Sequence, residues 1–319
     1  MRHRFPGSSP VHVVVLAAVL LALPGPAIAQ KQKSTLPRTP DGHPDMQGFW
    51  TNATFTPFER PEAFAAKEFF TDEEAAAFEK KRLQDEESQP QDDLHYDNVL
   101  WQRENLPKEV SNRRTSIVVD PPDGRVPAQT PAARQRLAAR AEVRKGSDAS
   151  DVEARTLQEQ CIIWAHVGPP MVPAGYNNTL QIVQTPGYVM ILQEMIHDVR
   201  VIPLDGRPHL PQNVRRWMGD SIGRWEGDTL VVDTTNFTDR TNYRGSTDAL
   251  HVVERFTRVD AATIRYTFTV EDAATWTKPW TGEISIRQFP DRIFEYACHE
   301  GNHDLGFLLD LAKKGLVPK

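Results

Sequence analysis

Residues 299–303 read His-Glu-Gly-Asn-His, which has the H-E-x-x-H spacing of zinc peptidases. In those enzymes the motif lies on a helix, so that both histidines share one face and bind the metal. Here it follows residues 292–298, whose alternation predicts a strand, and its own glycine and asparagine favour a turn. This context argues against a metal site at His299, Glu300 and His303, so the sequence predicts no metal ligands.

Two glutamates have the spacing for acid–base chemistry. Glu194 and Glu254 each lie two residues from apolar side chains on both sides, within predicted strands. This alternation would place both carboxyl groups inside a barrel, because every second side chain of a strand points to the same face. An apolar interior raises the pKa of a carboxyl group, which suits it as an acid or base near neutral pH. The alternative is that each glutamate pairs with an arginine, such as Arg200 or Arg265, to satisfy its burial.

Three further residues extend this catalytic set. His197 follows Glu194 by three residues and reaches the barrel rim only if a turn or bulge intervenes. His299 and Glu300 fall in the turn predicted after the last strand, at the barrel mouth beside a predicted disulfide. The predicted catalytic residues are therefore Glu194, His197, Glu254, His299 and Glu300.

Four side chains are predicted to hold or orient a substrate. Tyr176 lies in the proline- and glycine-rich residues 165–178, a segment suited to act as a lid or plug, and loops often carry function. Arg200 is predicted to orient the substrate together with Tyr176. Trp276 and Trp280 have rings that can stack on a sugar or an aromatic ring, with core or rim packing as the alternative.

The chain lacks the G-x-S-x-G elbow, the P-loop and the dinucleotide fingerprint. This argues against α/β serine hydrolases, nucleotidases and nicotinamide enzymes, and no cofactor is predicted. The net charge of −6 argues against a general polyanion binder, so nucleic acid is not an expected partner. A small-molecule ligand or substrate is the predicted partner, and the sequence indicates no oligomeric state.

The beginning of the chain has the features of an export signal. Arg2 and Arg4 precede an apolar run at residues 11–23, and the small-x-small cleavage pattern follows at residues 27–29. Because the run is short for a membrane span, we expect residues 1–29 to be cleaved off rather than to anchor the protein in the membrane. The predicted location is therefore the periplasm or the extracellular medium.

The chain has two cysteines, Cys161 and Cys298, and both lie beyond the predicted signal. An even pair in an oxidising compartment predicts a disulfide. The alternative is that Cys298 joins His299 and His303 on a metal ion, which leaves Cys161 unexplained.

The strand pattern predicts a mainly β fold. Residues 30–159 are polar, proline-rich and partly helical, and are expected to wrap the barrel. Residues 160–319 show period-2 runs with a turn signal about every ten residues, then a short C-terminal helix. We predict an antiparallel up-and-down barrel of about seven to nine strands, because an open meander of this length would leave exposed edges.

Several stretches of the chain resemble one large group of exported bacterial proteins. They are "GRWEGDTLVV" within residues 218–237, "QIVQTPGYVMIL" at 181–192, "ACHEGN" at 297–302 and "RTPDGHPDMQGFW" at 38–50. The resemblance covers most of the mature chain and implies no particular chemistry. The strand pattern also resembles that of lipocalin-like (calycin) barrels, an analogy of architecture alone, because a fold does not imply a function.

Three functional hypotheses follow from these features. The first is an exported barrel enzyme that acts on a small organic or oligomeric substrate by acid–base chemistry, as a lyase, isomerase or hydrolase. The second is a non-catalytic carrier of an apolar or aromatic ligand, and the third is a zinc peptidase. Titratable residues at predicted strand ends favour the first over the second, and the motif context makes the third the least favoured.

Overall fold

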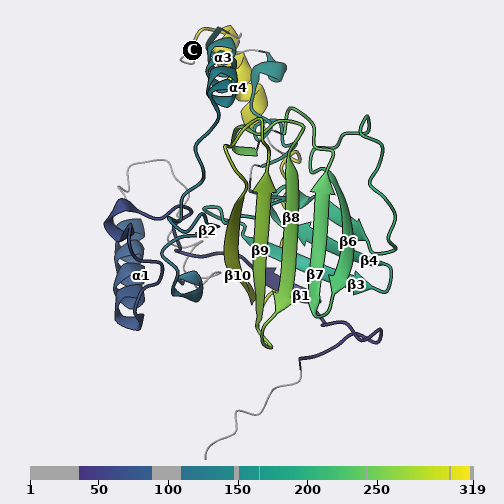
Figure 1. The fold of residues 1–319 in the computed structure, drawn as a ribbon. Helices are drawn as coiled ribbons and strands as arrows, with labels where there is room; N and C mark the ends of the chain where they lie inside the picture. Colours follow the sequence, from purple (N-terminus) through teal and green to yellow (C-terminus); the bar gives the residue numbers. More distant parts are fainter. Residues whose placement is uncertain are drawn as a thin grey trace, which may run out of the picture. The chain divides into compact units, whose positions relative to one another are not determined.

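Antiparallel strands dominate this computed structural model, which describes residues 36–87, 109–146, 151–164, 166–241, 243–301 and 303–316 (Figure 1). The predicted signal, residues 1–29, lies outside the described residues. Within the described part of the chain, no helix combines the length and the apolar character needed to cross a membrane.

Nine strands form one continuous path, in the order β5-β4-β3-β1-β10-β9-β8-β7-β6, and β2 pairs with β10 beside it. Figure 1 shows β6 to β10 in front of β3 and β4, as in a wall that curves round on itself. The predicted antiparallel barrel is confirmed. The strands are β1 (Gly48–Thr51), β2 (Val118–Asp120), β3 (Thr179–Thr185), β4 (Tyr188–Gln193), β5 (Val199–Pro203), β6 (Asp220–Glu226), β7 (Thr229–Thr235), β8 (His251–Arg258), β9 (Thr263–Glu271) and β10 (Trp280–Gln288).

The two ends of this path, β5 and β6, meet through side chains. Arg200 on β5 donates from Nη2 to Ser221 Oγ on β6 at 3.3 Å. Gly223 on β6 leaves room for its neighbours, since a Cβ there would lie 2.8 Å from Ile202 and 2.7 Å from Leu204. The barrel is therefore nearly closed, and its last seam depends on a polar bridge and on close apolar packing.

Period-2 alternation explains the strands that were easiest to predict. On β9, Ile264, Tyr266, Phe268 and Val270 are all at most 1% exposed, and the residues between them face outward. A tight hairpin joins β6 and β7 through Gly227, whose φ of +59° suits such a turn. These strands form from local pattern and turn chemistry alone.

Side chains fill the interior of the barrel. Trp50, Phe256, Tyr266, Phe268 and Trp280 are each at most 1% exposed and belong to one buried cluster. The predicted hollow is therefore wrong as a working surface. The physical reason is the size of these inward-facing rings, which occupy the space that smaller side chains would leave open.

Residues 166–172 pack against this interior. Met171 is fully buried, and its backbone N–H donates to the Tyr266 hydroxyl at 2.8 Å. Gly168, with φ of +94°, allows the close approach, since a Cβ there would lie 2.8 Å from Met171 Cγ. The segment predicted as a lid or plug therefore contacts a side chain of the barrel interior.

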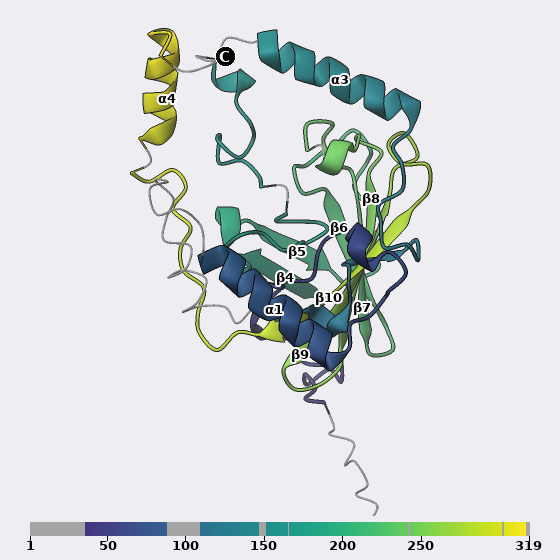
Figure 2. The same cartoon turned by 90° about the vertical axis from the view of Figure 1, so that its left-hand side faces the viewer.

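A capping box begins the first helix. At the start of α1 (Asp72–Glu87), the Thr71 N–H donates to Glu74 at 2.8 Å and the Glu74 N–H donates to Thr71 Oγ1 at 3.3 Å. The other helices are α3 (Pro131–Gly146) and α4 (Asp304–Lys313), with short 3₁₀ turns η1 (Glu62–Phe64), η2 (Ser111–Arg113), η3 (Val152–Ala154), η4 (Met195–His197) and η5 (Tyr243–Gly245). Figure 2 shows α3 beside the loops at one end of the strands.

Two features differ from the predicted arrangement. Residues 292–298 form no strand, and they run as irregular chain from β10 toward α4. The reason lies in the sheet, because β10 already pairs with β9 on one side and with β1 and β2 on the other. In addition, β1 and β2 belong to the predicted N-terminal region 30–159, yet both are strands of the barrel sheet.

Candidate functional site

The disulfide between Cys161 and Cys298 organises one end of the molecule. Its Cα atoms are 5.9 Å apart, and it joins two irregular segments that are 137 residues apart in the chain. The predicted pairing is confirmed. Beside it lies a second buried cluster, here called the disulfide cluster, which comprises Ile163, Val167, Met195, Ile196 and Met218 with Leu157, Ile162, Trp164, Trp217, Tyr296 and Cys298 packed against them.

Glu194 lies next to this cluster, directly after β4. Its Oε1 accepts a hydrogen bond from Asn177 Nδ2 at 3.1 Å, and the carboxylate also accepts one from the Phe294 backbone. Burial raises the pKa of Glu194 to about 7, and the bond from Phe294 opposes this only in part. The carboxyl group is therefore poised to gain or lose a proton near neutral pH.

The position of Glu194 differs from the predicted one. The buried residues of β4 are Val189, Ile191 and Gln193. Glu194 is an odd number of positions from each of them, so it follows the alternation of the outward-facing residues. The sequence does not decide which face of β4 points inward, because the outward-facing residues, such as Met190, are apolar as well. Glu194 thus lies outside the barrel interior, and its shifted pKa comes from the surrounding loops.

Three of the seven described non-glycine residues with a positive φ lie in the segments at this end of the molecule. Cys161, Asn177 and Ile196 have φ of +54°, +51° and +67°, in the left-handed region. For the β-branched Ile196 this conformation is a genuine outlier that costs about 1–3 kcal/mol, whereas an asparagine such as Asn177 adopts it readily. Strained residues are often found at active sites and ligand clamps. The conformation of Ile196 therefore supports a functional hypothesis for this end of the molecule.

Three rings lie beside the disulfide cluster. The Trp164 ring centroid is 5.5 Å from that of His166 and 6.1 Å from that of Tyr176. Burial lowers the pKa of His166 to about 4, and its Nε2 is buried with no hydrogen-bond partner in the described chain. Tyr176 is 42% exposed. A neutral histidine, a titrating glutamate and an accessible tyrosine are therefore present on neighbouring loops.

Glu254 and Arg200 lie inside the barrel, which corrects their predicted roles. Arg200 Nη1 donates to Glu254 Oε1 at 3.0 Å, and its Nη2 donates to the other oxygen. The Tyr266 hydroxyl donates to Glu254 Oε1 at 2.8 Å, and burial raises the pKa of Tyr266 well above its ordinary value. Because Glu254 is 0% exposed and Arg200 is 5% exposed, neither meets a substrate, and the alternative of a buried ion pair is confirmed.

The two predicted stacking tryptophans are also core residues. Trp276 is 3% exposed and Trp280 is 0% exposed, and their ring centroids are 5.9 Å apart. Trp280 also packs edge-on against Phe58 and Phe268. This burial and ring packing favour the alternative of core packing over stacking on a ligand.

The described residues of the His-Glu-Gly-Asn-His motif, 299–301 and 303, form no helix, and Glu300 and Gly301 lie in a turn. His299 and Glu300 are exposed, and α4 begins only at Asp304, after His303. Among the residues that the structure describes, no group of three His, Cys, Asp or Glu side chains is arranged to hold a metal ion. His197 ends η4, and its side chain lies outside the described part of the chain.

A polar cluster on the outer face of the barrel was not predicted. His209 Nδ1 lies 3.0 Å from Asp220 and its Nε2 lies 3.1 Å from Asp233, while His251 Nε2 also lies 3.0 Å from Asp233. The shared hydrogen bond lowers the pKa of Asp233 and raises that of His251. The cluster holds the loop between β5 and β6 on the barrel. Alternation alone puts Asp233 and His251 on the outer face, but the loop residue His209 has no such signal.

Comparisons with known proteins add little to this description. No protein-family model matches the chain, and no curated protein matches it. One solved structure, a mutant of the fluorescent protein UnaG, is 14% identical with a TM-score of 0.23, over 35% of this chain and 72% of that chain. At this TM-score the likeness carries no argument. The conclusions therefore rest on the barrel and on the geometry around the disulfide.

Proposed function

We propose that this chain binds a small organic molecule beside the disulfide and exchanges a proton with it through Glu194. The observation that carries the proposal is the partly buried Glu194 carboxyl group, whose pKa is raised to about 7. A group that titrates near the working pH has substantial acid and base populations, which suits general acid–base catalysis. The proposed reaction class is a lyase, isomerase or hydrolase reaction on a small or oligomeric organic substrate.

The neighbouring side chains support distinct roles in this proposal. Asn177 fixes the orientation of the Glu194 carboxyl group through its 3.1 Å hydrogen bond. Tyr176, which is 42% exposed, offers a ring face and a hydroxyl group to the substrate. His166 is neutral at pH 7 because burial lowers its pKa to about 4, so it is a weak base, and its buried Nε2 is assigned a hydrogen bond rather than a proton transfer.

The rim of the site and its location belong to the same proposal. His299 and Glu300 follow the disulfide directly and are exposed, so we assign them to the rim, with His197 of η4 beside Glu194. An exported location is supported by the disulfide, because such bonds persist in oxidising compartments.

A carrier without catalytic activity is the second candidate. The observation that favours it is apolar surface next to Glu194, where Tyr176 is 42% exposed and Phe294 is 67% exposed. Exposed aromatic rings offer faces on which an aromatic ligand can stack. In a carrier, Glu194 would only adjust the affinity for a ligand to the pH.

Glu194→Gln separates the two candidates. Wild type and variant are incubated with a panel of small esters, glycosides and hydroxy acids, with turnover followed by mass spectrometry and binding by ligand-observed NMR. The enzyme proposal predicts that Glu194→Gln lowers turnover by about 10²–10⁴-fold while binding persists, the usual contribution of a general acid or base. Glu295→Gln, an exposed change in the same segment, is the matched control and keeps wild-type turnover.

Binding without turnover by the wild type would instead support the carrier. Equal turnover by the wild type and Glu194→Gln would contradict the role of Glu194. No binding of any member of the panel would remove both candidates.

A further inference from the structure

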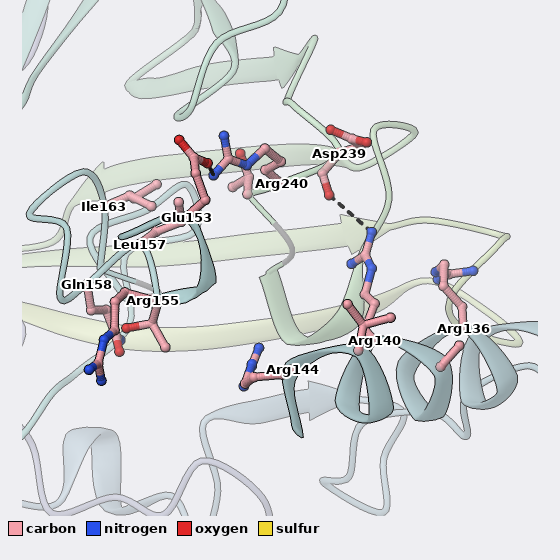
Figure 3. A pocket seen from close by; sticks show the side chains of 14 residues that line it. Arg136, Arg140, Arg144, Glu153, Arg155, Leu157, Gln158, Ile163, Asp239 and Arg240 are labelled. Carbon is pink, nitrogen blue, oxygen red and sulfur yellow. Dashed lines mark hydrogen bonds and ion pairs between the residues drawn. The ribbon is translucent and has the colours of Figure 1, made fainter. Parts of the chain in front are cut away.

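A groove of about 740 Å³ lies between α3, residues 153–163 and residues 239–241 (Figure 3). Five arginines and two acidic residues line it, together with apolar side chains. This excess of positive charge is opposite in sign to the net charge of −6 for the whole chain. A cleft lined by one sign of charge concentrates ligands of the other sign, so the groove favours anions.

One wall of the groove is a row of arginines on α3. Arg136, Arg140 and Arg144 are spaced by four residues, so they share one helix face, as Figure 3 shows. None has a carboxylate partner in the described chain: Arg136 donates to Thr275 Oγ1 and a backbone carbonyl, and Arg140 to the Asp239 carbonyl. Like charges at this spacing disfavour a helix, and a bound anion would relieve that repulsion.

The helix dipole accounts for only part of this row. Cations are favoured in the last turn of a helix, where Arg144 and Lys145 lie. Arg136 and Arg140 lie in earlier turns, where the dipole gives no such advantage. The helix dipole does not stabilise these two arginines, whereas an anion bound in the groove would.

The opposite wall adds a cation and an apolar surface. Arg240 contacts Glu153 at 3.4 Å, but the two side chains are 49% and 76% exposed, so this pair is weak. Figure 3 shows Arg240 across the groove from the arginines of α3. Leu157 and Ile163 supply apolar lining, and Ile163 also belongs to the disulfide cluster.

We propose that this groove binds an amphipathic organic anion, a carboxylate, sulfonate, sulfate or phosphate ester with an apolar body. The anionic group lies among Arg140, Arg144 and Arg240, where charge-assisted hydrogen bonds are available. The apolar body packs on Leu157 and Ile163. The volume falls in the range of about 300–1,000 Å³ typical of small-molecule sites, which favours a small ligand over a polymer. Glu194 does not line this groove, and the proposal does not depend on the function proposed for Glu194.

The test uses the full chain and two fluorescent dyes of similar shape. Anilinonaphthalene sulfonate carries one negative charge, and phenyl-naphthylamine is its uncharged counterpart. Saturable 1:1 binding of the sulfonate is expected, with affinity at least about tenfold above that of the neutral dye, the effect of one or two charge-assisted hydrogen bonds. Arg140→Gln/Arg144→Gln is expected to remove this advantage.

Two variants and one control make the outcome specific to the groove. Ala139→Trp keeps every arginine but fills the groove from an exposed helix position, and is expected to block binding of the sulfonate dye. Arg134→Gln removes one charge of the same helix outside the groove and is expected to bind like the wild type. A circular dichroism spectrum confirms that each variant is folded.

Three results would overturn the proposal. They are the absence of saturable sulfonate binding, equal affinity for both dyes, and wild-type affinity in Arg140→Gln/Arg144→Gln. Loss of turnover in Glu194→Gln does not affect these readings, so failure here and failure of the proposed catalysis are distinguishable.

Discussion

Glu254→Gln is expected to lower the free energy of unfolding by about 3–5 kcal/mol, the usual effect of breaking a buried ion pair. Glu254 is 0% exposed. Its carboxylate accepts hydrogen bonds from both Nη groups of Arg200 and from the hydroxyl of Tyr266. A glutamine fills the same space but leaves the guanidinium charge buried without a counter-charge. Urea unfolding followed by tryptophan fluorescence measures the change.

Two further variants show whether the charge pair is the cause. Arg200→Met/Glu254→Leu removes both charges and is expected to be more stable than Glu254→Gln, since replacing a buried pair by apolar side chains is often neutral. Glu271→Gln changes an exposed carboxylate at the end of β9 and is expected to stay within about 0.5 kcal/mol of wild type. A loss below 1 kcal/mol in Glu254→Gln would contradict the described network.

Cys161→Ser/Cys298→Ser is expected to lower the free energy of unfolding by about 2–5 kcal/mol. The disulfide closes a long loop, because its cysteines are 137 positions apart, and cross-linking a long loop removes more entropy from the unfolded chain than cross-linking a short one. The effect is also local, because residues 290–301 have no strand ladder to hold them. Limited proteolysis is therefore expected to cut the variant between β10 and α4.

The same variant reports on the site. Glu194 is buried partly by the segment that contains Phe294, whose backbone contacts its carboxylate. Release of this segment exposes Glu194, so its pKa is expected to fall toward the ordinary value of a glutamate. Wild-type protein treated with reductant provides the matched control. Unchanged urea midpoint and unchanged proteolysis in the double variant would contradict a stabilising role for the disulfide.

Much of the fold could be predicted because its signals are local. The hairpin of β6 and β7 is fixed by its turn residues, and the alternation of β9 places Ile264 to Val270 correctly. Strand β1 could not be found this way. Its four residues, Gly48–Thr51, pair with β3 and β10, which are distant in sequence, and no turn marks it.

The sequence indicates whether the barrel interior is hollow or filled, and the prediction of a hollow interior is wrong. The inward positions include Phe256, Tyr266 and Phe268, and rings of this size at consecutive inward positions indicate a filled barrel. The phase of β4 was not decidable, because both of its faces carry apolar residues. A shift of one residue exchanges the two faces of a strand, and it moved Glu194 from the interior to the loops.

The candidate site was predicted only in part. Glu194, Tyr176 and the disulfide were named from the sequence, whereas Asn177 and Trp164 were not, because their contacts join separate loops. The groove arginines of α3 are spaced by four residues in the sequence, which indicates a charged helix face. Their groove depends on residues 153–163 and 239–241, which no sequence pattern brings together.

The most direct test of a functional site outside the filled barrel is the titration of Glu194. NMR of isotope-labelled glutamate side chains, recorded from acidic to alkaline pH, gives the midpoint, and Glu194→Gln assigns the signal. We predict a midpoint at a pH of about 7. A midpoint near the ordinary glutamate pKa of about 4.3 would show a solvated carboxylate and would contradict the proposal.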